Sequence, residues 1–535
     1  MGKEIPFKHF GAMLDCSRNG VMKPRVVKTM IDYLSQMGYN TLMLYTEDTY
    51  EVDNQPYFGH LRGRYSQKEL MEIDAYARSK GVELIPCIQA LAHLNAIMRW
   101  PQYRDMSDCD DILCIGDDRV YQLLEDIFAT LDRCFTSRTV NIGMDEAYML
   151  GLGRYRERNG YPDRTAIFLS HLNKVAAIGK KYGFTLCMWS DMFFRLATGE
   201  HYGEGKLDSR VKDLIPENVQ LIYWDYDNWD KAHYDSLMKR HKELGEDIWF
   251  AGGAYTWTGF APHNSYSIEA ARKTVDCCIE NHISHMLITL WGDNGNECSK
   301  FSALPTLFTL SELVKGNKDM ENIRCKFQKM FGLSFDQFML LELPDTANAE
   351  GVCNPDKYML YSDCFLGPWD STVRDTDAQR YKACAEKLAK IPEEYPLSYI
   401  FRTQKALCDV LACKFDLGLR TRKAYREKDR LELQALLPRY EDLVSKLEIL
   451  YKAFEEQWMT ENKPHGFDVQ DIRIGGLIRR VTHCRERLSQ YLNGQIETLE
   501  ELEEPLLEVF GRGADFQPVP VCFNDWKTAA TANVL

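Results

Sequence analysis

Two carboxylates stand side by side at Asp145 and Glu146, directly after the mostly apolar run 139–144. A run of this composition favours a short buried strand. Because burying unpaired charge is expensive, we expect both acids at the rim where the strand opens into a loop. An isolated Asp-Glu pair is more often the first turn of a helix, where acidic side chains are favoured. The residues that accompany this pair favour a catalytic role instead.

Aromatic residues mark the ends of the later predicted strands. Each of four tryptophans stands close to an acid or a tyrosine: Trp189, Trp224, Trp257 and Trp291. One such tryptophan would be ordinary core packing. Four of them, with acids and an arginine between, are typical of a carbohydrate site, because pyranose faces stack on aromatic rings and hydroxyls bind carboxylates and guanidinium groups. A phosphate-binding barrel would show a glycine-rich anion loop after its seventh and eighth strands. Gly252 and Gly253 lie at the end of the seventh predicted strand, but Tyr255 and Trp257 follow them at once.

The adjacency of the two acids indicates a type of glycoside chemistry. Most glycosidases place two carboxyl groups on opposite sides of the scissile bond. Neighbours such as Asp145 and Glu146 would lie on one side of the substrate. They suit a substrate-assisted route, in which one acid protonates the glycosidic oxygen. The other acid orients a 2-acetamido group, whose carbonyl oxygen attacks the anomeric carbon.

Strands and helices alternate from Phe10 to about residue 315. Nearly continuous apolar strands are predicted at 10–15, 41–45, 82–87, 139–144, 185–189, 219–224, 248–252 and 286–291. Amphipathic helices lie between them, with Pro24 at the start of the first and the capping box Ser66 to Glu69 at the start of the second. Such alternation predicts a parallel sheet covered on both faces, and eight units predict a (β/α)8 TIM barrel. Catalytic residues of that fold lie at the C-terminal ends of its strands.

The pattern changes after about residue 335. We expect residues 1–335 to form the catalytic barrel and 336–535 an α-helical C-terminal domain. Loop character is predicted for 340–375, helices at 376–391, 398–425, 430–459 and 468–493, and an irregular tail at 516–535. Leucines at 433, 436, 443, 447 and 450 have the spacing of a packed helix face, and Pro438 predicts a kink or break there.

Composition excludes several classes of protein. The net charge of −14 argues against nucleic-acid and anionic-membrane partners, and we find neither a membrane-spanning run nor a signal peptide.

The seventeen cysteines are scattered, so free thiols in a reducing, cytoplasmic compartment are expected. No metal or cofactor is predicted: the pair His282 and His285 and the cluster 108–111 lack ligand spacing and are interpreted as surface groups. For the helical region, packing or self-association as a homodimer is the expectation.

These motifs resemble glycoside hydrolase family 20, the β-N-acetylhexosaminidases, and are most similar to the bacterial branch in which a helical domain follows the barrel. Residues 143–146 resemble the family's Gly-x-Asp-Glu signature, which implies that Asp145 polarises the acetamido group and Glu146 is the general acid/base. Arg18 matches the arginine that binds the outer hydroxyls. His93 resembles the histidine near the general acid, without the usual Pro-Gly before it. The four tryptophans match the indoles that enclose the acetamido methyl group and floor the sugar ring.

Two features depart from the family pattern. The eighth strand ends in Trp291-Gly292-Asp293, where the family has Trp-x-Glu, so Asp293 is a shorter acid at that position. The tyrosine that binds the acetamido oxygen could be Tyr226 or Tyr255, and Tyr226 is preferred. The first strand is predicted near Phe10, so we do not expect the family's small N-terminal α+β domain before it.

The sequence therefore predicts an exo-acting, retaining β-N-acetylhexosaminidase that removes terminal β-GlcNAc or β-GalNAc from small glycoconjugates or oligosaccharides. Two alternatives stay open. Another retaining glycosidase, such as an exo-β-glucosaminidase or an O-GlcNAc hydrolase, would use a similar barrel. A non-catalytic sugar-binding barrel is less well favoured, because the acid pair at Asp145 and Glu146 is intact.

Overall fold

The computed structural model describes residues 5–205, 207, 209–245, 247–346, 353–374, 376–507 and 526. The chain divides into two compact units, which are described separately. The first comprises Met1–Ala254, Ser267–Trp291 and Thr306–Asp319, and the second comprises Tyr255–Tyr266, Gly292–Pro305 and Met320–Leu535. The domain boundary expected near residue 335 stays a prediction.

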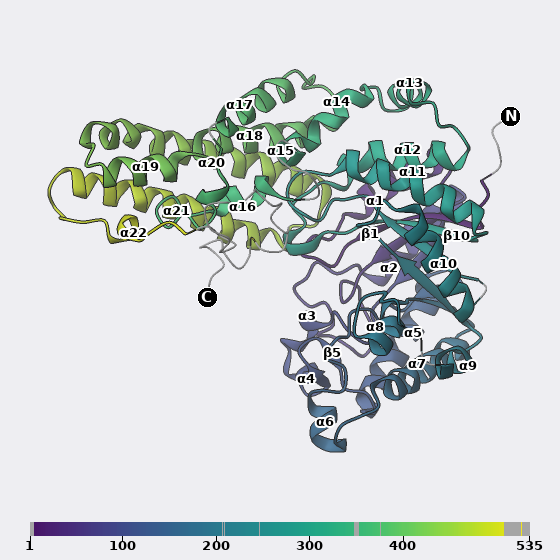
Figure 1. Cartoon of the computed structure of the whole chain (residues 1–535). Coiled ribbons are helices and arrows are strands. Elements are labelled where there is room, and N and C mark those ends of the chain that lie inside the picture. Colours follow the sequence, from purple (N-terminus) through teal and green to yellow (C-terminus); the bar gives the residue numbers. More distant parts are fainter. Residues whose placement is uncertain are drawn as a thin grey trace. The chain divides into compact units, whose positions relative to one another are not determined.

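The first unit contains a barrel of parallel strands (Figure 1). The barrel is closed, and its eight strands have the order β1-β10-β9-β8-β7-β6-β3-β2. The strands are His9–Asp15 (β1), Thr41–Tyr45 (β2), Glu83–Cys87 (β3), Thr139–Asn141 (β6), Thr185–Trp189 (β7), Val219–Trp224 (β8), Trp249–Gly253 (β9) and His285–Leu290 (β10). The predicted TIM barrel and its eight strands are thus confirmed. Their C-terminal ends share one rim, which is where the acid pair follows β6.

Helices connect successive strands and follow the last one. They are α1 (Pro24–Met37), α2 (Gln67–Ser79), α5 (Asp118–Cys134), α7 (Arg164–Lys181), α10 (Lys231–Leu244), α11 (Asn264–Glu280) and α12 (Leu304–Val314). Their ends follow local rules: Pro24 is at N1 of α1, Gly38 caps it with a φ of 97°, and Ser66 and Glu69 form the predicted capping box.

Additional short elements lie in the loops of the first unit. Between β3 and α5 are α3 (Asn95–Met98), α4 (Pro101–Arg104) and a two-stranded sheet of β4 (Ser107–Cys109) and β5 (Ile112–Leu113). The loops after β6 and β7 contain α6 (Arg154–Asn159), α8 (Asp191–Thr198) and α9 (Ser209–Leu214). These insertions carry little periodicity, so the sequence pattern does not predict them.

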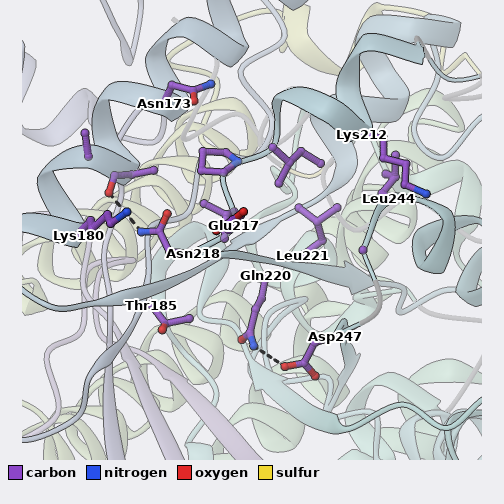
Figure 2. Close-up of a pocket in the computed structure, with 16 residues that line it drawn as sticks. Asn173, Lys180, Thr185, Lys212, Glu217, Asn218, Gln220, Leu221, Leu244 and Asp247 are labelled. Atoms are coloured by element: carbon purple, nitrogen blue, oxygen red, sulfur yellow. Dashed lines mark hydrogen bonds between the residues drawn. The ribbon is translucent and has the colours of Figure 1, made fainter.

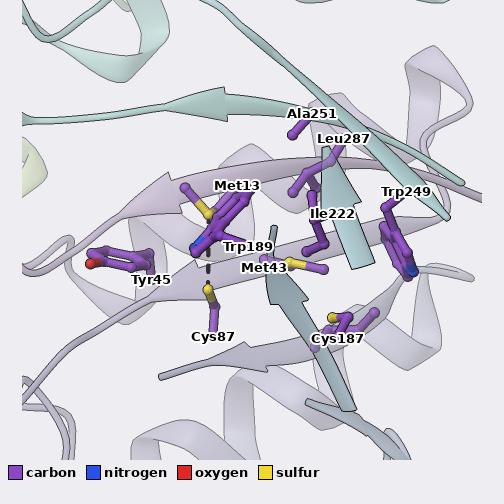
Figure 3. Packing of buried hydrophobic residues seen from close by; sticks show 11 residues of the cluster. Met13, Met43, Tyr45, Cys87, Cys187, Trp189, Ile222, Trp249, Ala251 and Leu287 are labelled. Carbon is purple, nitrogen blue, oxygen red and sulfur yellow. Dashed lines mark hydrogen bonds between the residues drawn. The ribbon is translucent and has the colours of Figure 1, made fainter. Parts of the chain in front are cut away.

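The barrel interior is filled by side chains that point inward from the strands (Figure 3). The cluster includes Met13, Met43, Ile85, Trp189 and Trp249, all at most 1% exposed. Trp224 and Trp291 are partly buried and pack against this cluster. The interior is therefore a packed core. Near the C-terminal ends of the strands this core is aromatic, and the side chains of the rim pack against it.

The second unit is built mainly of helices (Figure 1). The larger ones are α13 (Met320–Phe331), α17 (Asp377–Leu388), α18 (Ser398–Lys414), α19 (Leu417–Arg426), α20 (Arg430–Glu461) and α21 (Phe467–Leu492), and the shorter ones include α14 (Phe335–Met339), α16 (Pro355–Tyr361) and α22 (Glu500–Glu503). Neighbours α17 and α18, α18 and α20, and α20 and α21 pack against one another. The five leucines predicted to face a neighbour, from Leu433 to Leu450, are at most 1% exposed.

Three local predictions in this unit need correction. The expected helix 398–425 is two helices, α18 and α19, and the expected loop 340–375 contains α16. Pro438 does not break α20, which continues through it, so the predicted break is wrong, whereas a kink there stays a prediction. It lies two turns from the N-terminus of a 32-residue helix, whose buried face outweighs one missing hydrogen bond. Except for Trp526, the predicted irregular tail lies outside the described residues.

Two groups interpreted as surface residues are buried in part. His285 is fully buried at the start of β10, where its Nε2 lies 2.8 Å from Asp247 and its Nδ1 lies 2.7 Å from Nδ1 of His9. Asp108 is 5% exposed and accepts backbone hydrogen bonds from Gly151 and Tyr155. Both side chains are buried because they have polar partners that sequence spacing does not reveal.

The sixteen cysteines among the described residues are free thiols, and all but Cys109 and Cys325 are buried. This agrees with the expectation of unpaired thiols. Within the described part of the chain, none of the helices combines the length and apolar character that crossing a bilayer requires.

Candidate active site

Strand β6 ends early because the chain turns sharply behind it. Gly143 and Met144 have φ values of 68° and 69°, in the left-handed region that favours glycine. A Cβ atom on Gly143 would lie 2.1 Å from Oε1 of Gln89, so the glutamine side chain needs this glycine. The same Oε1 accepts the Met144 N–H at 3.1 Å. Gln89, after β3, therefore holds the turn that delivers Asp145 and Glu146 to the rim.

The acid pair shares one imidazole. Nε2 of His93 lies 3.2 Å from Oδ2 of Asp145 and 3.5 Å from Oε2 of Glu146. These are ion-pair distances, because the Nε2 angles are not those of an aligned hydrogen bond. The Asp145 side chain is only 10% exposed, whereas that of Glu146 is 40% exposed. One acid is thus enclosed and the other faces solvent.

The surroundings shift the pKa values of the two acids in opposite directions. Burial works against the charge of Asp145, but the His93 imidazolium and the amide of Gln89, 2.8 Å away, outweigh it and hold the pKa of Asp145 below its ordinary value. Burial, followed by the charge of Asp145, raises the pKa of Glu146. Burial opposes the charge of His93 as well, yet Asp145 raises the pKa of this imidazole to about 9. The arrangement is an ionised acid beside one that retains its proton to higher pH.

A third carboxyl group stands behind the pair. Asp191 is fully buried after β7; its Oδ2 accepts the Glu146 N–H at 3.0 Å and its Oδ1 the indole N–H of Trp224 at 3.4 Å. Burial, and then the charge of Asp145, raises the pKa of Asp191 to about 7. This residue supports the backbone of Glu146, whose φ is 52°.

Arg18 joins the same network from β1. Its Nε donates to Oε1 of Glu47 at 2.9 Å, and that oxygen also accepts the Tyr45 hydroxyl at 3.0 Å. The hydroxyl of Tyr45 in turn accepts from Gln89 at 3.0 Å. A continuous chain of hydrogen bonds thus connects Arg18 with Asp145 across the ends of four strands, β1, β2, β3 and β6. The side chain of Arg18 is 28% exposed, so it is partly accessible from solvent.

Aromatic residues of the first unit form a further part of the rim. The indole N–H of Trp291 donates to the Tyr226 hydroxyl at 3.0 Å, and the ring of Tyr226 lies 5.2 Å from that of Trp224. Trp291 also packs edge-on against Tyr45 and lies 6.0 Å from Trp189. Trp189 is 1% exposed, and its indole belongs to the core beneath the others. The structure thus brings three of the four predicted tryptophans together with Tyr226.

The remaining predicted site residues, Tyr255, Trp257 and Asp293, belong to the second unit. There the rings of Tyr255 and Trp257 are stacked with centroids 3.9 Å apart, and both side chains are buried. Asp293 begins a short 3-10 helix, Asp293–Gly295. Their roles toward a substrate stay predictions.

Two residues near the acids were not identified from the sequence. The Tyr148 hydroxyl donates to Oε1 of Glu146 at 3.1 Å. Asp111, in the turn of the β4–β5 hairpin, accepts the N–H of His93 at 3.0 Å. Tyr148 could have been found by its spacing, two residues after Glu146, whereas no local signal links Asp111 with His93.

His93, Asp145 and Glu146 could together hold a metal ion, since their ligand atoms lie within 4.8 Å of one another.

A cavity of about 880 Å³ lies elsewhere, lined by residues that include Thr185, Val219, Lys180 and Lys212 (Figure 2). Thr185 and Val219 begin their strands, so this cavity is at the N-terminal end of the barrel, away from the acids. Catalytic residues of this fold lie at the other end.

Comparison with known families agrees with this site. Residues 7–244 match the model described as glycosyl hydrolase family 20, catalytic domain. Residues 335–517 match the model described as glycoside hydrolase 20C C-terminal domain. The two matches name successive domains of one family, and the chain belongs to glycoside hydrolase family 20.

Individual relatives are distant. Hexosaminidase D of Homo sapiens is 24% identical over 252 residues, 43% of this chain and 49% of the relative, so the match spans about half of that protein. Hexosaminidase D of Bos taurus is 24% identical over 330 residues, 56% of this chain and 90% of the relative. A solved structure of a GH20 exo-β-N-acetylglucosaminidase from Vibrio harveyi has a TM-score of 0.47 at 16% identity, covering 63% of this chain and 58% of that one.

Proposed function

We propose that this protein is an exo-acting, retaining β-N-acetylhexosaminidase that removes terminal β-GlcNAc or β-GalNAc by substrate-assisted catalysis. The observation that carries the proposal is the contrast within the acid pair: Asp145 is enclosed with a lowered pKa, and Glu146 is 40% exposed with a raised pKa. A stabilising carboxylate and a general acid need these opposite properties.

Each acid has its own part in this mechanism. Glu146 protonates the glycosidic oxygen as the bond to the leaving group breaks. Asp145, ionised beside His93, accepts the N–H of the 2-acetamido group, so the carbonyl oxygen attacks the anomeric carbon and an oxazolinium forms. Glu146 then removes a proton from water, which opens this ring with retained configuration.

Other rim residues would hold the sugar. Arg18 offers a partly exposed guanidinium to the outer hydroxyls, and Trp224 and Trp291 offer indole faces. Tyr226 is placed by its bond from Trp291 and would donate its hydroxyl to the acetamido oxygen. Small oligosaccharides or glycoconjugates in the cytoplasm are the substrates that this proposal implies.

Turnover of aryl β-GlcNAc and β-GalNAc, compared with the N-deacetylated aryl glucosaminide, tests the proposal. A free amine cannot form the oxazolinium, so we expect cleavage of the two acetylated substrates alone and inhibition by a thiazoline mimic of the intermediate. Equal cleavage of the deacetylated substrate would instead favour an ordinary two-carboxylate glycosidase.

A further inference from the structure

The loop that follows Glu146 presents an exposed aromatic ring beside the proposed general acid. Tyr148 is 37% exposed and Met149 is 49% exposed, although both follow a buried strand end. The hydroxyl of Tyr148 already contacts Oε1 of Glu146 at 3.1 Å. Since the general acid must touch the glycosidic oxygen, a ring this close to it lies on the side where the leaving group departs.

The loop is held in place before any ligand binds. The carboxylate of Asp108 accepts the Gly151 N–H at 2.6 Å and the Tyr155 N–H at 2.7 Å. Arg164, the first residue of α7, donates to the carbonyl oxygens of Leu150 at 2.9 Å and of Tyr148 at 2.5 Å. Binding to such a preformed surface costs little ordering entropy.

Two guanidinium groups contact Tyr148, one at its ring and one at its backbone. The guanidinium of Arg195, in α8, lies 4.9 Å from the ring centroid of Tyr148, and Arg164 binds the backbone of the same residue. Among the residues that the structure describes, neither arginine forms a salt bridge with a carboxylate. Burial, and then the charge of Arg195, lowers the pKa of Arg164, which reflects the proximity of the two cations. Such a pair suits an anionic ligand.

We infer that Tyr148, Arg164 and Arg195 form a leaving-group subsite for an acidic sugar. The ring of Tyr148 would stack on the sugar next to the cleaved bond, and Arg195 would bind an anionic group on that sugar. Arg164 adds positive charge and holds the backbone of Tyr148. This inference rests on the proposed function and specifies its substrate class: β-N-acetylhexosaminides whose leaving group is an acidic sugar.

Three substrates test the subsite: β-GlcNAc linked to glucuronate, β-GlcNAc linked to glucose, and methyl β-GlcNAc. The two disaccharides differ only by the carboxylate. We expect kcat/KM to be roughly 10- to 100-fold higher for the glucuronate, the size of a hydrogen bond to a charged group. A disaccharide ending in 6-sulfated glucose distinguishes a sulfate-binding from a carboxylate-binding subsite.

Variants distinguish the contribution of the Tyr148 ring from that of the Arg195 charge. Arg195→Met should reduce the glucuronate-to-glucose ratio toward one, and Arg195→Lys should retain part of it. Tyr148→Ala should lower kcat/KM for both disaccharides roughly tenfold more than for the methyl glycoside, because stacking is lost. The matched control is the pair Arg156 and Tyr161, where a guanidinium lies 4.1 Å from a ring that is 78% exposed. Arg156→Met and Tyr161→Ala should leave all ratios unchanged.

The possible failures are distinguishable. If the protein cleaves none of these substrates, the proposed function itself fails. If it cleaves methyl β-GlcNAc but handles glucose and glucuronate equally, or if Arg195→Met keeps the preference in a folded protein, the subsite is refuted. Circular dichroism of each variant establishes that it is folded.

Discussion

Nε2 of His93 lies 3.2 Å from Oδ2 of Asp145, and this ion pair connects the loop after β3 with the end of β6. The same nitrogen lies 3.5 Å from Glu146, so one cation acts on both acids. The strength of this effect differs between them, because Asp145 is enclosed and Glu146 is partly exposed. The roles that we propose for the two acids therefore depend on burial and on His93, a residue some fifty positions away along the chain.

Replacing each acid should produce a different kinetic signature. Asp145→Asn and Glu146→Gln should each reduce kcat/KM on an aryl β-GlcNAc by about 10²–10⁴-fold. With a dinitrophenyl leaving group, which needs no proton, Glu146→Gln should recover most of its activity and Asp145→Asn should not. Initial rates on both substrates measure this difference. Near-normal turnover by both variants would remove these residues from the mechanism.

The pH profile should depend on His93. The imidazolium lowers the pKa of both acids, so His93→Gln should raise the pKa of Asp145 and of Glu146. In the proposed mechanism, activity requires Asp145 ionised and Glu146 protonated, so both limbs of the kcat/KM profile should move to higher pH. The acid limb should move further, since His93 is the dominant favourable partner of Asp145. An unchanged acid limb would contradict the assigned ion pair.

Tyr148→Phe should shift only one limb of the pH profile of kcat/KM. The hydroxyl of Tyr148 lowers the pKa of Glu146 by donating to its carboxylate, so its removal should raise that pKa further. The basic limb should then move to higher pH while the acid limb stays in place. The same kcat/KM profile on an aryl substrate measures both limbs, and a shift of the acid limb would count against this assignment.

Gly143→Ala should damage both stability and activity. Gly143 has a φ of 68°, and the new Cβ would meet Gln89 at 2.1 Å. Gly183, with a φ of 74° and open space around it, is the matched control. Both alanine variants should lose about 1–2 kcal/mol from the left-handed backbone. Only Gly143→Ala should lose more than this and reduce kcat on the order of 100-fold, by displacing the turn. Urea denaturation and initial rates test both expectations, and equal losses in the two variants would contradict the role of Gly143.

Leu447→Ala should test the packing of α20 in the second unit. Leu447 is fully buried, so its truncation should lower the free energy of unfolding by about 2–5 kcal/mol. Ile449, two residues further on, is 61% exposed, and its replacement by alanine should change that free energy by less than about 0.5 kcal/mol. Chemical denaturation curves of the two variants give this difference, and similar losses would refute the assigned helix face.

Local patterns in the sequence were enough for much of the fold. Strand and helix periodicity predicted all eight barrel strands, because continuous apolar strands and amphipathic helices leave few other arrangements. The leucine spacing in α20 likewise predicted its buried face. The continuity of α20 through Pro438 could not be predicted, since it depends on packing along the rest of a long helix.

For the site, the sequence by itself determined which residue types stand at the strand ends: the acid pair, Arg18, His93 and the indoles. Tertiary structure alone decided that Trp189 lies in the core, that Gln89 fills the space above Gly143, and that Tyr148 contacts Glu146. The reason is physical. Residue type and periodicity are local, whereas burial, ion pairing and the resulting pKa values depend on residues brought together from distant strands and loops.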